Sequence, residues 1–350
     1  MKKLYAFFIL VLLFSTERLH ATHIMGGEIT YAVHDKVLPL DSVMVRLSLY
    51  RDCTGASLGS TANVSISGCS GLSSTTLNLI PGSGNDITPV CAGWVSPCQS
   101  LTSSVGVEEY IYEGYITIPT NCTSPITFSY TLCCRNSDIT MGAADDNFYI
   151  TSAMMPTLNN SPVFLNTPVV FGYVGQPLQF SFAASDPDGD SLAFSLKPAM
   201  QTATTTVVYN QGFTYQQPFD SITHFDSITG VATIIPTTAQ IGVIAAEVRE
   251  YRNGALVGKV ERDMQVIILN NAQNNFPTIS GVSGTNAYDV FANPGDSISF
   301  FAVLSDADPF DTVTAYWTSG INANMTVTGD TAWFSWIPDT SHVQFAPHLA

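Results

Sequence analysis

Two short loops of the sequence carry three aspartates each. They are Asp186, Asp188 and Asp190 in the first loop, and Asp306, Asp308 and Asp311 in the second. Carboxylates this close together repel one another unless a cation or protons intervene. Ca²⁺ takes about six to eight hard oxygen ligands, so each loop is a candidate calcium site, with nearby asparagine amides and carbonyls as further ligands. The alternative is a tight turn without an ion, because Asp-Pro-Asp-Gly is favourable turn chemistry.

The sequence offers little that would support catalysis. It has no H-E-x-x-H or P-loop motif, and its histidines are scattered. Two glutamate pairs, Glu108-Glu109 and Glu247/Glu250, would suit a glycosidase, but we interpret them as solvated charges at strand edges. We therefore expect that the protein is not an enzyme.

The elements that must position the aspartates are strands. Apolar residues alternate with polar ones, with a period of two, over residues 43–49, 110–118, 126–132, 178–182 and 298–303. Clusters of Gly, Pro, Asn and Asp separate these runs. Residues 238–252 suggest a helix, although their β-branched content weakens that interpretation. The sequence predicts an all-β chain of sandwich domains.

All seven cysteines lie in the first half of the chain. They are Cys53, Cys69, Cys91, Cys98, Cys122, Cys133 and Cys134. Such clustering predicts disulfides that tie one domain, and a zinc site is less favoured because no C-x-x-C pair is present. An odd number leaves one thiol over, for which the adjacent Cys133 and Cys134 are candidates. The spacing does not specify the pairing.

Export is predicted from the N-terminus. Residues 1–21 combine two lysines, an apolar run too short to span a bilayer, and a small residue suited to cleavage, which is typical of a signal peptide. No later apolar run is long enough for a membrane span. The formal charge of −16 argues against binding to nucleic acid or to anionic lipid. We expect a secreted or cell-surface protein, exported across the inner membrane and then the outer membrane.

Two asparagine- and proline-containing joints divide the chain. The first joint is residues 158–164 and the second is residues 270–277. They predict a Cys-rich β domain over 22–157, a sandwich repeat over 158–270 and a second repeat over 271–350. Residues 175–188 match residues 295–308, 120 positions later, which supports the repeat. Because the second repeat lacks a final strand, we expect it to be incomplete and the chain to continue with further repeats.

The repeats resemble a known family. Asp-x-Asp follows a strand, an Asn-rich joint precedes Pro, and the tail runs Asp226-Ser227-Ile228-Thr229-Gly230-Val231-Ala232-Thr233-Ile234-Ile235-Pro236. These motifs are similar to cadherin-like, dystroglycan-type repeats of bacterial surface proteins. The resemblance implies tandem immunoglobulin-like sandwiches with calcium at the Asp-rich loops.

The N-terminal domain carries a second resemblance. Its motifs are Thr22-His23-Ile24-Met25-Gly26-Gly27-Glu28, Tyr50-Arg51-Asp52-Cys53 and Cys133-Cys134-Arg135-Asn136. They resemble the start of large Bacteroidetes surface proteins associated with gliding motility and type IX secretion. The resemblance implies a non-catalytic adhesin or spacer, whose partners are surface glycans or proteins.

Aromatic residues support one alternative function. Trp317, Trp333 and Trp336 favour a stacking platform for sugars, as in a carbohydrate-binding region of a large secreted hydrolase. Trp333 and Trp336 are an odd number of positions apart, which predicts that they lie on opposite faces of a strand, so that at least one belongs to the core.

Overall fold

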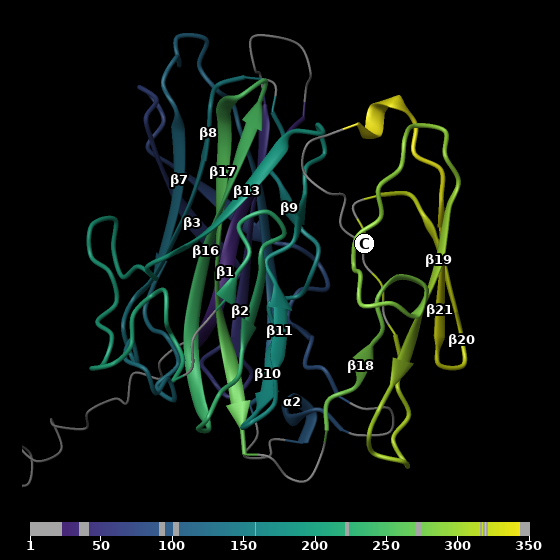
Figure 1. Ribbon diagram of the computed structural model, residues 1–350. Coiled ribbons are helices and arrows are strands. Elements are labelled where there is room, and N and C mark those ends of the chain that lie inside the picture. Colours follow the sequence, from purple (N-terminus) through teal and green to yellow (C-terminus); the bar gives the residue numbers. More distant parts are fainter. Residues whose placement is uncertain are drawn as a thin grey trace, which may run out of the picture.

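The computed structural model shows an almost entirely β-stranded chain, which confirms the predicted all-β class (Figure 1). It describes residues 23–34, 42–90, 95–100, 105–157, 159–220, 224–270, 275–315, 317, 319 and 321–343. The predicted signal peptide, residues 1–21, lies outside the described residues. In the described part of the chain, no helix has the length and apolar character that crossing a membrane requires.

The N-terminal strands surround one hydrophobic core. The elements are β1 (Ile24–Val33), β2 (Val43–Asp52), β3 (Thr61–Ser67), β4 (Ser74–Leu79), β5 (Asn85–Asp86), the short helix α2 (Pro97–Ser100), β6 (Val107–Ile116), β7 (Ile126–Leu132) and β8 (Phe148–Met154). Apolar side chains alternate along these strands, and the inward set is buried, as the pattern of β3 shows. Burial of these side chains is the main favourable contribution to folding of this part.

The first repeat is a β-sandwich. Its elements are β9 (Val163–Phe164), β10 (Val170–Tyr173), β11 (Leu178–Ser181), β12 (Ala184–Ser185), β13 (Ser191–Lys197), β14 (His224–Phe225), β15 (Val231–Ile234), β16 (Gln240–Arg252) and β17 (Ala255–Leu269). One sheet has the order β11-β15-β14, and the other contains β13, β16, β17 and β10. Phe180, Ile234 and Val248 are among the side chains that fill the core between the two sheets.

A long hairpin forms the centre of the molecule. β16 and β17 are joined by Asn253 and Gly254, whose φ angles of 52° and 78° are those that a two-residue hairpin turn requires. The predicted helix over residues 238–252 is therefore wrong. β16 pairs with β13 on one edge and with β17 on the other, and both of its faces are covered. A strand covered on both faces shows no clean alternation, which explains the error.

The structure joins the units predicted over 22–157 and 158–270 in one 12-stranded sheet. β17 is long enough to pair with β8, β1 and β10 in succession along its second edge. Two buried ion pairs cross the predicted boundary. Arg262 binds Glu28, and Arg135 binds both carboxylate oxygens of Asp263 at 2.9 and 2.7 Å. These two units therefore share one sheet.

The second repeat has a sheet of its own. Its elements are β18 (Thr278–Ile279), η1 (Val282–Gly284), β19 (Ile298–Ser305), β20 (Asn324–Thr328), β21 (Thr331–Trp336) and η2 (Thr340–His342), with the sheet order β18-β19-β21-β20. The N–H of Gly175 donates to the carbonyl of Pro236, and the N–H of Gly295 donates to that of Pro338, at 2.8 and 2.7 Å. These equivalent hydrogen bonds support the internal repeat.

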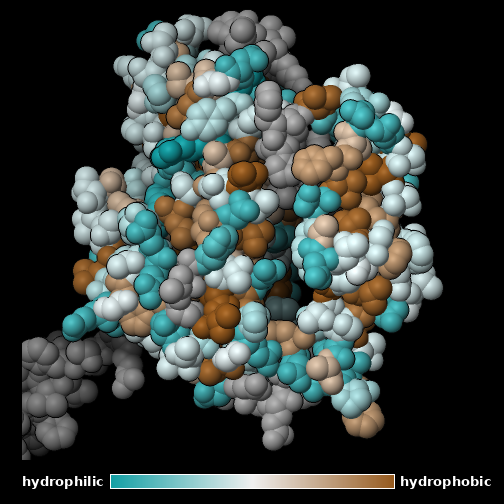
Figure 2. Space-filling view, in the orientation of Figure 1, coloured by the Kyte–Doolittle hydropathy of each residue, from teal (hydrophilic) through white to brown (hydrophobic). Residues whose placement is uncertain are grey.

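Apolar surface is prominent on the second repeat. Phe291 and Phe310 are 93% and 96% exposed, whereas Leu304 and Phe334 are buried. Figure 2 shows hydrophobic residues, in brown, on the lobe that this repeat forms at the right of Figure 1.

Disulfides tie the N-terminal part, as predicted. Three bridges are described: Cys53–Cys98, Cys69–Cys122 and Cys133–Cys134. The first connects the end of β2 to α2, and the second connects the β3–β4 turn to the segment before β7. The interpretation that Cys133 or Cys134 is the leftover thiol is wrong, because these two are joined to each other. Cys91 lies outside the described residues.

Candidate metal site at the first joint

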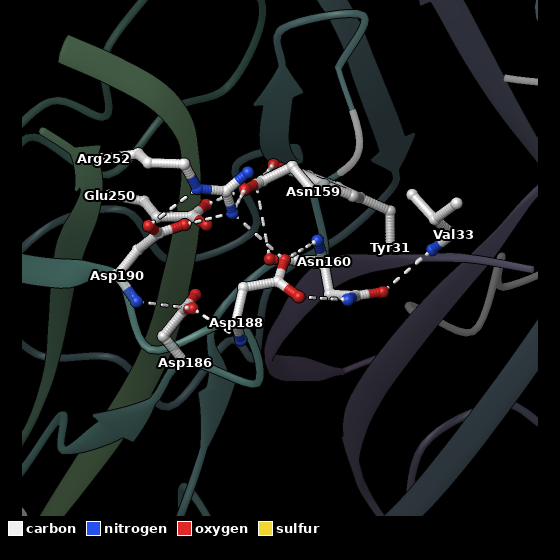
Figure 3. A network of polar contacts seen from close by, with 9 residues as sticks. All are labelled: Tyr31, Val33, Asn159, Asn160, Asp186, Asp188, Asp190, Glu250 and Arg252. Carbon is white, nitrogen blue, oxygen red and sulfur yellow. Dashed lines mark hydrogen bonds and ion pairs between the residues drawn. The ribbon is translucent and has the colours of Figure 1, made fainter. Parts of the chain in front are cut away.

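The first acidic cluster combines three aspartates of one loop with a glutamate from a distant strand. Its members are Asp186, Asp188, Asp190 and Glu250, and one carboxylate oxygen of each lies within 4.8 Å of the others. The loop runs from β12 to β13, and Gly189 adopts the left-handed φ of 79° at its turn. The N–H groups of Asp188 and Asp190 both donate to Oδ1 of Asp186 at 2.9 Å. The backbone of the loop thus orients its aspartates together, as Figure 3 shows.

Two asparagines of the first joint connect this cluster to the N-terminal strands. Asn160 donates from its backbone N and from Nδ2 to the two carboxylate oxygens of Asp188, at 2.7 and 2.8 Å. Its Oδ1 accepts the N–H of Val33 on β1 at 3.0 Å. Nδ2 of Asn159 donates to Oε2 of Glu250 at 2.8 Å. The joint therefore links β1, the acidic loop and β16 (Figure 3).

One guanidinium group faces the cluster. Arg252 lies two residues after Glu250 on β16, and its Nε and Nη2 donate to the two oxygens of Asp190 at 2.9 and 2.5 Å. Nη2 also lies 2.7 Å from Oδ1 of Asn159 and 3.3 Å from Oδ2 of Asp188. Hydrogen bonding to Asp190 raises the pKa of Arg252. One positive charge therefore stands opposite four carboxyl groups.

The carboxyl pair of Glu250 and Asp186 is electrostatically unfavourable when both members are ionised. Glu250 is fully buried, and this burial together with the charge of Asp186 raises its pKa to about 10. Burial also raises the pKa of Asp186. Oε1 of Glu250 and Oδ2 of Asp186 are buried and accept no hydrogen bond from any described residue. Two such oxygens side by side require a proton or a cation.

The residues of the first cluster fit a divalent cation. Two ligands of one Ca²⁺, each at about 2.3–2.6 Å, lie no more than about 5 Å apart, which matches the spacing of these four carboxylates. The two buried oxygens without partners supply ligand positions that the protein itself does not satisfy. Asp186, Asp188, Asp190 and Glu250 are thus the candidate ligands, of which the sequence predicted the first three.

Glu250 and Arg252 are the site residues that sequence reasoning missed. Glu250 was interpreted as a solvated strand-edge charge, but its exposed fraction is 0%. That interpretation is wrong because β16 is paired on both edges, with β13 and with β17, and Glu250 lies opposite Leu192, next to the acidic loop. The usable signal was the Asn-Gly turn just after Arg252, which marks a hairpin and therefore a strand.

The second acidic cluster consists of Asp306, Asp308 and Asp311, whose oxygens also lie within 4.8 Å of one another. Asn275 of the second joint donates from its backbone N and from Nδ2 to the two oxygens of Asp308, at 2.6 and 3.1 Å. The N–H of Asp308 donates to Oδ1 of Asp306 at 2.8 Å. These contacts repeat those of Asn160, Asp188 and Asp186, but none of the three aspartates is buried.

The tryptophans lie on both faces of the second sheet, as the alternation predicted. Trp333 is 49% exposed and packs beside Phe301, with ring centres 5.3 Å apart. On the other face, Trp317 contacts Phe334 edge to face. Trp336 contacts the ring of His342. The structure thus does not gather the three tryptophans into one platform.

Comparisons with known proteins assign no family. No protein-family model matches the chain, and no curated protein matches it. Among solved structures, the chain is similar to a marsupial T cell receptor, with 11% sequence identity over 88% of this chain and 91% of that chain and a TM-score of 0.19. That score is too low to support an argument about fold or function.

Proposed function

We propose that the chain is a non-catalytic, exported adhesin or spacer of the cell surface, in which Ca²⁺ at the acidic clusters stiffens the joints between β domains. The all-β fold, the disulfides and the acidic composition support an extracellular structural role. An association with gliding motility and type IX secretion belongs to the same proposal and is supported by the sequence resemblance.

A repeated contact carries the proposal. In both joints, one asparagine donates two hydrogen bonds to the middle aspartate of the acidic loop that follows, namely Asn160 to Asp188 and Asn275 to Asp308. Each acidic loop is therefore attached to the segment that connects one unit to the next. A change of charge in the loop acts directly on the geometry of the joint.

The residues of the first cluster have separate roles in this proposal. Asp186 and Glu250 offer the buried oxygens that lack hydrogen bonds. Asp188 connects the loop to the joint, because its carboxylate accepts a hydrogen bond from Asn160. Bound Ca²⁺ supplies the positive charge that relieves carboxylate repulsion. Asn160 then holds β1 through the N–H of Val33, so that the loop, the joint and the N-terminal strands stay in register.

Calorimetric melting of the chain from residue 22 in Ca²⁺ and in chelator tests the proposal. We expect Ca²⁺ at about 100 times its Kd to stabilise the fold by about 2.7 kcal/mol, a Tm rise of about 5–10 °C. Limited proteolysis between the repeats should slow in parallel. Asp226→Asn serves as a control, since Asp226 forms a turn outside both clusters. Equal melting and equal protease sensitivity in both conditions would refute the proposal.

A carbohydrate-binding region of a secreted hydrolase is the second candidate. It is favoured by Trp333, which is half exposed beside Phe301 on a sheet face. Sugar rings stack on such exposed aromatic surfaces through apolar contact. A glycan array on the same chain, with Trp333→Ala as the comparison, would identify such binding.

A further inference from the structure

Three oxygens from three residues converge on a single nitrogen of Arg252. Nη2 lies 2.5 Å from Oδ2 of Asp190, 2.7 Å from Oδ1 of Asn159 and 3.3 Å from Oδ2 of Asp188. Two of these oxygens belong to carboxylates and the third belongs to an amide of the joint (Figure 3). A hard cation is bound in just such a group of carboxylate and amide oxygens, at about 2.3–2.6 Å.

The partnerless oxygens lie in the other half of the cluster. They belong to Glu250, which is fully buried, and to Asp186. The described contacts of Arg252, in contrast, go to Asp188, Asp190 and Asn159. The oxygens of the cluster therefore form two groups. One group contacts the guanidinium of Arg252, and the other consists of the oxygens of Asp186 and Glu250.

We propose that Arg252 is a built-in cation that fills the second ion position of the first acidic cluster and so fixes the number of divalent ions that the cluster binds. Removing its charge opens this position, which then takes one more Ca²⁺. The count in the unchanged protein, one ion at Asp186 and Glu250, rests on the proposed function. The increase by one rests on the contacts of Arg252 alone.

Charge neutrality leads to the same count. Four ionised carboxylates beside one guanidinium carry a net charge of −3, which one divalent ion reduces to −1. Without the guanidinium the charge is −4, which two divalent ions neutralise. A second divalent ion beside Arg252 would leave an uncompensated positive charge in a half-buried site, which is costly.

Counting bound ions tests the inference. The chain from residue 22 carries Asp308→Asn, so that the second acidic cluster does not contribute, and bound Ca²⁺ is measured by equilibrium dialysis with and without Arg252→Gln. We expect the number of bound ions to rise from one to two. The control is Arg249→Gln on the same strand, whose side chain is 51% exposed and pairs with Glu247. It removes the same charge outside the cluster and should not alter the count.

Two further variants distinguish the effect of the lost positive charge from a loss of folding. Arg252→Lys keeps the positive charge and should bind the same number of ions as the unchanged protein. Asp190→Asn combined with Arg252→Gln restores the net charge of the cluster and should return the count to one. If Arg252→Gln is folded only in millimolar Ca²⁺, as read by circular dichroism, that result also supports the inference. A variant that stays unfolded in Ca²⁺ would overturn it.

The possible counts distinguish the inference from the proposed function. A count that rises from one to two in Arg252→Gln supports the inference and the proposed function. A count that rises from zero to one supports the role of Arg252 and refutes the ion at Asp186 and Glu250. A count of one with and without Arg252→Gln keeps the proposed function and overturns the inference. A count of zero with and without Arg252→Gln refutes the inference and the proposed function.

Discussion

The two acidic clusters begin from the same local structure and differ in what lies opposite them. In each cluster, an asparagine of the joint donates a hydrogen bond from Nδ2 to the middle aspartate, and the first aspartate accepts a hydrogen bond from the N–H of the middle one. Opposite the three aspartates of the first cluster lie the buried Glu250 and the guanidinium of Arg252. Among the described residues, no arginine or lysine pairs with the aspartates of the second cluster. The loop motif is therefore only half of the candidate site, and a strand distant in sequence supplies the other half.

This difference changes the electrostatics of the two joints. Asp190 and Glu250 are buried, so charges there are screened weakly and each needs a partner. The second cluster has no buried member, and water and salt screen its repulsion. We therefore expect the first cluster to dominate the response of stability to mutation and to cations. The second should influence mainly the local opening of its joint.

Removing Arg252 should have the largest effect. Arg252→Ala leaves the buried carboxylate of Asp190 without its ion pair, so we expect the free energy of unfolding in chelator to fall by about 3 kcal/mol. Ca²⁺ should restore part of the loss. Urea denaturation with and without chelator measures both values. Arg249→Ala, an exposed arginine of the same strand, should change stability by no more than about 0.5 kcal/mol. Similar losses in the two variants would contradict this account.

Glu250→Gln should remove the cation response of the first joint without weakening the protein in chelator. Because burial raises the pKa of Glu250 to about 10, its side chain is protonated in the cation-free fold at pH 7, and an amide resembles that form. The expected loss is the cation contribution, about 2.7 kcal/mol at 100 times the Kd. Melting in Ca²⁺ and in chelator tests it, and an unchanged Ca²⁺ shift would contradict the assignment of Glu250.

The same raised pKa fixes the sign of a pH effect. The unfolded carboxyl has a pKa of about 4.3, so between that value and about 10 folding takes up a proton at Glu250. This group therefore contributes stability at low pH that is lost as pH rises. In chelator, Glu250→Gln should reduce the fall in stability between pH 5 and pH 9, measured by urea denaturation. A steeper fall in the variant would show the opposite sign.

Sequence reasoning found the local half of the candidate site and missed the distant half. The aspartates, the joints and the repeat are visible because each is a short run of characteristic residues. Glu250 enters the site through the register in which it lies opposite Leu192, and a single sequence does not reveal register. Because β16 is buried on both faces, its sequence also lacks the alternation of apolar and polar residues that marks a strand. The shared sheet was missed for a similar reason, because β17 pairs with strands of both predicted units.

Substitution of the joint asparagines should cause a smaller loss of stability, and the same change can be made in both joints. Asn160→Ala removes the bond from Nδ2 to Asp188 and leaves the N–H of Val33 without its acceptor, for an expected loss of about 1–2 kcal/mol. The side chain of Asn275 makes the equivalent bond to Asp308 in an exposed setting, so Asn275→Ala should cost about half as much. Chemical denaturation of the two variants gives the ratio. Equal losses would mean that the first joint gains nothing from its contact with β1.

Asp308→Asn should have the smallest effect on stability. Its carboxylate has no described cationic partner, and relief of repulsion with Asp306 and Asp311 offsets the weaker bond to Asn275, so the change in chelator should stay within about 0.5 kcal/mol. Its effect should appear instead in Ca²⁺, as faster proteolysis between the repeats. Asp188→Asn, in contrast, should lower the melting temperature because it also breaks contacts to Arg252. If Asp308→Asn lowered the melting temperature as much as Asp188→Asn, burial and Arg252 would not be what distinguishes the two clusters.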